Sequence, residues 1–228
     1  MELALFGDNA LTFLLRWVHL LAGVTWIGLL YYFNFVQGEY FKEADGGAKS
    51  DAIQKLVPRA LWWFRWGAMF TFLSGILLLY FLPNLKHISG TGIIVGATLG
   101  TIMFLNVWLV IWPNQKIVIA SAKQVAGGGD ALPDAAAALG KAGLASRTNT
   151  LFSIPMLFFM AASNHLGGNL VLPMSQTTPL ELSTVFGLIA VLALNGLFGK
   201  TGPFTSVKGV ISSGFVLTVI LYLLIEIF

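Results

Sequence analysis

Long apolar runs separated by shorter polar stretches dominate this chain of 228 residues. A helix needs about 20 mostly apolar residues to cross the hydrocarbon core of a bilayer. The runs that meet this requirement lie at roughly 11–36, 60–82, 91–112, 150–168, 180–198 and 208–227. The pattern therefore predicts an all-α integral membrane protein, with residues 1–228 forming a single transmembrane domain, a bundle of about six helices.

The connection between the third and fourth predicted spans is long and has its own pattern. A glycine triplet at 127–129 is followed by an alanine-rich run at 135–145. We expect this run to form a short helix at or above the membrane surface, with an unstructured loop as the alternative. The third span can also continue past Pro113, because spanning helices tolerate proline at a kink.

Basic residues are distributed unevenly between the connections and predict an orientation. The first, third and fifth connections are rich in lysine and arginine, whereas the second holds Lys86 and the fourth has none. Cytoplasmic loops of membrane proteins carry an excess of these residues. We therefore expect both termini on the periplasmic side of a bacterial inner (plasma) membrane. Tryptophans gather near the cytoplasmic ends of the second and third spans, as an interfacial belt would: Trp62, Trp63, Trp66, Trp108 and Trp112.

The composition limits the class of protein and the kinds of site that the chain can form. The chain is 57% hydrophobic and 10% charged, whereas soluble domains carry about 25% charged residues. Its net charge of +3 is too small and dispersed to indicate a nucleic-acid partner. The absence of cysteine excludes a thiol nucleophile, iron–sulfur ligation and covalently attached haem. Any metal or haem must therefore depend on histidine, methionine or carboxylate ligands.

The first predicted span carries a polar stripe. At 100° per residue, the residues that share one side of this helix with His19 are Arg16, Gly23, Trp26, Asn34 and Gln37. Ionisable side chains inside a membrane are costly and usually face protein, ligand or water. For His19 the stripe leaves two interpretations, a cofactor ligand or an interhelical hydrogen bond to a serine or a carbonyl.

His165, near the outer end of the fourth span, is the candidate second ligand. Both histidines are expected in the outer half of the membrane, with His19 about 8 Å deeper. Joint ligation of one haem would thus need a tilted or shifted helix. His87, in an outer loop, is a substitute ligand or a solvated loop residue. Arg65, at the inner end of the second span, is expected to pair with a polar group or an anionic ligand.

Two motifs carry a resemblance to a known family. The run from His19 to Gln37, HLLAGVTWIGLLYYFNFVQ, is similar to the first helix of the membrane domain of bacterial FAD-independent urate hydroxylases, the urate oxidase N-terminal domain family. The run WPNQK at 112–116 is similar to the end of that family's third helix. In that family a cytochrome c domain typically follows and removes electrons. This chain ends at Phe228 without a Cys-x-x-Cys-His motif, so the resemblance implies a separate periplasmic cytochrome c or a larger membrane complex.

The expected function is that of a membrane redox protein of the urate hydroxylase type that passes electrons to this cytochrome. Haem b would be ligated by His19 and His165, with three further cofactor neighbours: Arg16, Gly23 and Trp26. The expected substrate ligands are Asn34, Gln37 and Arg65. Two alternatives stay open, a non-catalytic accessory subunit of a larger complex and a small-molecule transporter. The sequence assigns no catalytic residue and leaves homo-oligomerisation open.

Overall fold

The computed structural model of the chain describes residues 10–81 and 90–227, and these residues form helices and no β-strand. Two of the long helices are continuous through a π-helical segment. The first consists of α1 (Ala10–Tyr31), η2 (Tyr32–Gln37) and α2 (Gly38–Glu43). The second consists of α4 (Thr91–Leu105), η4 (Asn106–Ile111) and α5 (Trp112–Ala126). The others are α3 (Gly46–Phe81), α6 (Ala135–His165), α7 (Pro179–Phe198) and α8 (Val207–Ile227). Short 3-10 turns lie between them: η5 (Gly168–Val171), η6 (Met174–Gln176) and η7 (Gly202–Thr205).

Several of these helices are long and apolar enough to cross a membrane. Within the described residues five stretches qualify: Ala10–Glu43, Gly46–Phe81, Thr91–Ala126, Pro179–Phe198 and Val207–Ile227. The prediction of a multi-pass helical membrane protein is thereby confirmed. The sixth span and the orientation of the termini stay predictions.

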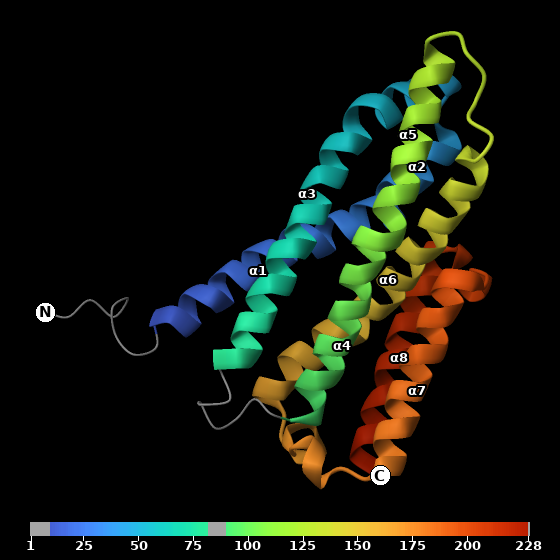
Figure 1. Cartoon of the computed structure of the whole chain (residues 1–228). Helices are drawn as coiled ribbons and strands as arrows, with labels where there is room; N and C mark the ends of the chain where they lie inside the picture. The colour runs from blue at the N-terminus through green and yellow to red at the C-terminus, as the bar shows by residue number, and fades with distance from the viewer. Residues whose placement is uncertain (1–9, 82–89, 228) are drawn as a thin grey trace, which may run out of the picture.

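Helix α6 is less apolar than these five stretches, and other helices surround it. It packs against α4, α5, α7 and α8 and passes behind α4 in Figure 1. Its buried residues include a run of polar side chains from Thr148 to Thr150, followed by Ser153. A helix enclosed by other helices can carry such residues where a lipid-facing helix cannot.

The predicted boundaries were too narrow for several helices. The third helix does continue past Pro113 and ends at Ala126, as the sequence allowed. The alanine-rich run at 135–145 is not a separate surface helix, because α6 begins at Ala135 and runs unbroken to His165. Hydropathy detects only the apolar part of a helix, whereas these helices extend into charged and small residues beyond it. The last two predicted spans agree closely with α7 and α8.

Two buried asparagines join α6 to the middle of the α4–η4–α5 helix. Asn106 donates a hydrogen bond from Nδ2 to Oδ1 of Asn149 over 2.8 Å, and Nδ2 of Asn149 donates to the Met103 carbonyl over 2.9 Å. This pairing lies at the transition from α4 to η4. A π-helical turn interrupts the regular i→i−4 ladder, and side chains of neighbouring helices then help to satisfy the main-chain groups.

Helices α1 and α3 form a second closely packed pair. A Cβ atom at Gly67 would lie 3.1 Å from the backbone nitrogen of Trp26, so the glycine allows the two backbones to approach. Trp26 is 1% exposed as a result. Figure 1 shows the first half of α1 and the last half of α3 extending together away from α7 and α8.

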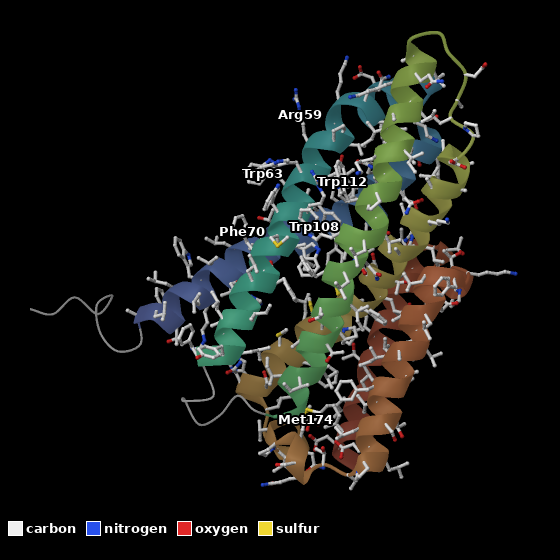
Figure 2. All side chains as sticks on the ribbon, viewed as in Figure 1. Arg59, Trp63, Phe70, Trp108, Trp112 and Met174 are labelled. Carbon is white, nitrogen blue, oxygen red and sulfur yellow. The ribbon has the colours of Figure 1, made fainter. Side chains whose placement is uncertain are left out.

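Exposed aromatic residues lie near the middle of α3. Trp62, Trp63 and Trp66 are exposed, and the ring of Trp66 packs edge-on against Trp108 with 5.8 Å between centroids. Figure 2 shows Trp108 and Trp112 between α3 and the α4–η4–α5 helix. Such a cluster is typical of the membrane–water interface, as the sequence predicted.

Candidate functional site

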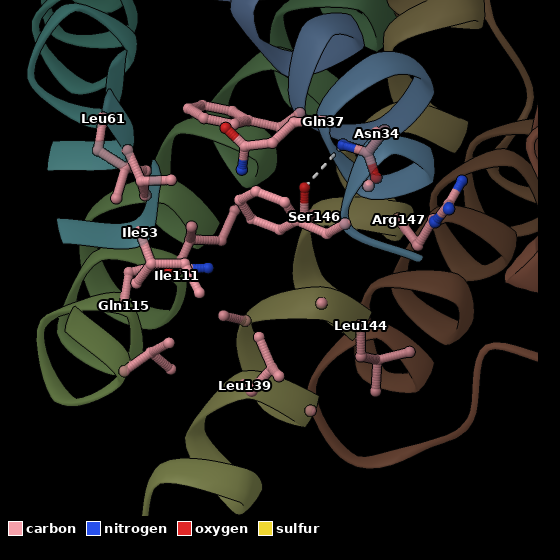
Figure 3. Close-up of a pocket in the computed structure, with 18 of the residues that line it drawn as sticks. Asn34, Gln37, Ile53, Leu61, Ile111, Gln115, Leu139, Leu144, Ser146 and Arg147 are labelled. Carbon is pink, nitrogen blue, oxygen red and sulfur yellow. Dashed lines mark hydrogen bonds between the residues drawn. The ribbon is translucent and has the colours of Figure 1, made fainter. Parts of the chain in front are cut away.

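A cavity of about 470 Å³ opens where η2 and α2 meet α3, α5 and the first half of α6 (Figure 3). Pockets for small molecules commonly have volumes of roughly 300–1,000 Å³. Its apolar wall includes Phe33, Phe41, Ile53, Leu61, Phe64, Ile111, Leu139 and Leu144. Its polar groups come from Asn34, Gln37, Lys42, Lys49, Gln115, Ser146, Arg147, Thr201 and Thr205. The cavity thus combines flat apolar faces with amides and cations.

The side-chain oxygen of Gln37, in the wall of this cavity, has no hydrogen-bond partner among the described residues. This oxygen, Oε1, is buried. Figure 3 shows the side chain extending from η2 into the cavity, on the side of Gln115 and Ile111. A buried acceptor without a partner costs about 1–3 kcal/mol. A ligand with an N–H group could recover this energy if the Gln37 amide turned its oxygen toward the open space of the cavity.

The amide nitrogen of the neighbouring Asn34 is hydrogen-bonded within the protein. This nitrogen, Nδ2, donates to the Leu30 carbonyl over 2.9 Å and to Oγ of Ser146 over 2.8 Å, shown dashed in Figure 3. The first bond lies at the start of the π-helical segment η2, and the second joins this segment to α6. Asn34 therefore fixes the wall from which Gln37 extends.

Three basic residues and no acidic residue line the cavity within the described part of the chain: Lys42, Lys49 and Arg147. Lys42 forms an ion pair with Glu39 at 2.8 Å, and Nζ of Lys49 lies 5.9 Å from the centroid of Phe41. Arg147 lies at the edge, its guanidinium directed away from the centre in Figure 3, with a buried Nη1 that has no hydrogen-bond partner. Burial lowers the pKa of Arg147 and the Glu39 carboxylate opposes this, so the guanidinium stays charged. The charges favour an anionic ligand.

Of the predicted substrate ligands, Asn34 and Gln37 line this cavity and Arg65 does not. The Cζ atom of Arg65 instead lies 3.4 Å from the ring centroid of Trp112. The sequence did not identify Gln115 or Arg147. In the sequence, Arg147 lies in a connection rich in basic residues. If the alanine-rich run at 135–145 is continuous with the following span, Arg147 lies within one helix, one turn after Gly143.

The predicted stripe on the first helix does not face one site. His19 and Trp26 face α3, whereas Asn34 binds Ser146 of α6. A helical wheel at 100° per residue assumes an uninterrupted α-helix, and η2 changes the phase after Tyr31. The prediction of a single stripe was wrong for this reason.

The histidines lie far from the cavity. His19 is fifteen residues before Asn34, which is about 22 Å along a helix, and His165 is eighteen residues after Arg147, about 27 Å. Nδ1 of His19 lies 3.1 Å from Oγ of Ser74, so the interhelical hydrogen bond, one of the two predictions, is present. His87 lies outside the described residues.

The surroundings of His19 meet one requirement of a haem site. Oγ of Ser74 lies 2.6 Å from the Phe70 carbonyl and 3.1 Å from the Thr71 carbonyl, and the tautomer of His19 decides which atom donates between His19 and Ser74. A tautomer with its hydrogen on Nδ1 would leave Nε2 unprotonated, as a ligand must be. His165, however, is exposed at the end of α6 and no described contact joins it to His19. A haem ligated by both histidines does not fit this arrangement without movement of helices.

The remaining predicted cofactor neighbours do not enclose an open space. Gly23 lies against Thr71, since a Cβ atom there would be 4.0 Å from the Thr71 methyl group, and Trp26 packs on Gly67. Arg16 is exposed on α1. The room left by Gly23, which the sequence assigned to a flat group or to a neighbouring backbone, is therefore occupied by the neighbouring helix α3.

Comparison with known proteins connects the cavity to a family. A family model described as "Urate oxidase N-terminal" matches residues 85–191, which include α4, η4, α5, α6 and part of α7. The match contains the motif at 112–116 and the cavity residues Gln115 and Arg147, while the motif of the first helix lies outside it. No curated protein and no solved structure matches the chain. Residues 85–191 thus match the urate oxidase N-terminal family, and the apolar helices of the chain fit a membrane protein related to urate hydroxylase.

Proposed function

We propose that this chain is the membrane component of a urate hydroxylase-type oxidoreductase and that the cavity between η2, α3, α5 and α6 binds urate. The observation that carries the proposal is the unpaired carboxamide of Gln37 in an apolar cavity with a basic rim. The family match to residues 85–191 supports the choice of ligand.

The chemistry of urate complements this wall. Urate is a flat anion whose edge alternates N–H donors and carbonyl acceptors. A carboxamide offers one acceptor and two N–H donors, so Gln37 can accept from a ring N–H and donate to the adjacent carbonyl. The rings of Phe33 and Phe64, 5.5 Å apart and edge-on, form an apolar wall for the ring faces. Lys49 and Arg147 supply positive charge at the rim.

Binding of urate by the purified protein tests this proposal directly. Equilibrium dialysis in detergent should detect binding to the wild type and about tenfold weaker binding to Gln37→Leu, which corresponds to about 1.4 kcal/mol. Gln54→Leu is the matched control, because the Gln54 amide donates to Ser50 on the same helix and does not line the cavity. Equal affinity of wild type and Gln37→Leu would contradict the assignment.

Oxidation of urate also requires an electron carrier, and bound haem b would supply one-electron chemistry. If the protein binds haem b through His19, the purified protein should show a Soret band that shifts on dithionite reduction and is lost in His19→Ala. A colourless preparation that still binds urate would contradict the haem prediction and leave the cavity proposal intact.

A further inference from the structure

Two cations share one tryptophan ring on the face of α3 and α5 outside the cavity. The Cζ atom of Arg65 lies 3.4 Å from the Trp112 centroid, and Nζ of Lys116 lies 5.7 Å from the same centroid. Arg65 is also 5.7 Å from the ring of Trp108. We call these four residues the Trp112 patch: Arg65, Trp108, Trp112 and Lys116. None of them lines the cavity, so the patch is a separate feature.

No carboxylate neutralises the patch within the described residues. The ion pairs found there join Lys42 to Glu39 and Lys55 to Asp51, on other parts of the helices. Arg65 donates from Nε to the Leu61 carbonyl over 3.1 Å, and its terminal Nη groups have no described hydrogen bond. Stacking on Trp112 covers a face of the guanidinium and leaves the edge N–H groups available.

The surroundings place the patch at the level of lipid headgroups. Trp62, Trp63 and Trp66 on the same helix are 48%, 59% and 37% exposed. Tryptophan is enriched at membrane–water interfaces, where its ring lies at headgroup depth. Figure 2 shows Phe70 further along α3 than Trp63. An apolar surface thus continues from the cations along the helix.

We propose that the Trp112 patch binds the phosphate of an anionic phospholipid. A guanidinium donates two parallel hydrogen bonds to phosphate oxygens, and its planar stack fixes the direction of both. Lys116 adds a second positive charge, 5.7 Å from the same Trp112 ring. The acyl chains lie along Trp66 and Phe70, both exposed on α3. This proposal does not depend on urate binding.

Lipid titration of the purified protein tests this site. In neutral detergent, dioleoyl phosphatidylglycerol should raise the melting temperature of the wild type, and phosphatidylcholine should not. Arg65→Gln should require about tenfold more phosphatidylglycerol for the same shift, as expected for loss of a charge-assisted bidentate contact. Arg59→Gln is the matched control: it removes the same charge from the same helix at an exposed position without a described ring contact.

The outcomes separate a built site from general attraction. Equal weakening by Arg65→Gln and Arg59→Gln would overturn the proposal in favour of non-specific electrostatics. An equal shift with inorganic phosphate alone would overturn the assignment to lipid. Lys116→Gln changes an exposed side chain and provides a second variant if Arg65→Gln does not fold. Unchanged lipid dependence in Lys116→Gln would likewise count against the site.

Discussion

The variant Gly143→Trp should lose urate binding, with affinity lowered by about a hundredfold, or about 2.7 kcal/mol. Gly143 lines the cavity from α6, and a Cβ atom there would meet no heavy atom within 4 Å. A large side chain can therefore enter the open space without displacing the helix. Equilibrium dialysis with labelled urate measures the loss.

Gly187→Trp provides the control for this experiment. Gly187 is exposed on α7, a Cβ atom there also meets nothing within 4 Å, and the residue does not line the cavity. Both variants replace a helical glycine by the same residue, so their effects on helix stability are comparable. Wild-type affinity in a folded Gly143→Trp protein would exclude the cavity as the urate site.

A second large effect is expected on stability. Asn149→Leu should lower the free energy of unfolding by about 2–3 kcal/mol. Asn149 is 0% exposed, accepts from Asn106 and donates to the Met103 carbonyl. Leucine would leave both partners buried without their hydrogen bonds, in an environment where water cannot replace them. Reversible unfolding in mixed detergent micelles measures the change.

Two further variants separate this polar contact from general effects of the substitution. Asn164→Leu lies on the same helix but is exposed, and its bond to the Met160 carbonyl is long at 3.5 Å. We expect a change within about 0.5 kcal/mol there. The double variant Asn106→Leu with Asn149→Leu should lose less free energy of unfolding than the two single losses added together, because it leaves neither amide without its partner. Additive losses would show that the two amides are not coupled.

Much of the fold was predictable because apolar runs have a simple physical cause. Lipid-facing helices must be apolar along their length, and α7 and α8 agree with their predicted spans. Helix α6 was predicted too short because its polar residues, such as Asn149, are satisfied by neighbouring helices. Sequence hydropathy cannot distinguish a polar helix end in water from a polar segment enclosed by protein.

The candidate site was predictable only in part. The first helix drew attention to Asn34 and Gln37, which line the cavity, because polar residues in such a segment need a partner. The approach of Asn34 to Ser146 joins residues more than a hundred positions apart, and no periodicity within one helix contains that information. The sequence predicts Arg65 as a substrate ligand because a deep cation needs an anion or a polar group. The Trp112 ring that stacks on it comes from another helix, and the pattern of the second span does not contain that contact.

The π-helical segment η4 has a consequence for both proposed sites. Its i→i+5 turns accommodate one residue more than an α-helix would, and one residue corresponds to a rotation of about 100°. The rotation of α5 relative to α4 therefore depends on this one extra residue. Gln115 faces the cavity and Trp112 stacks under Arg65 in the same rotational setting. A small twist of α5 would therefore move Gln115 in the cavity wall and the Trp112 ring under Arg65 together.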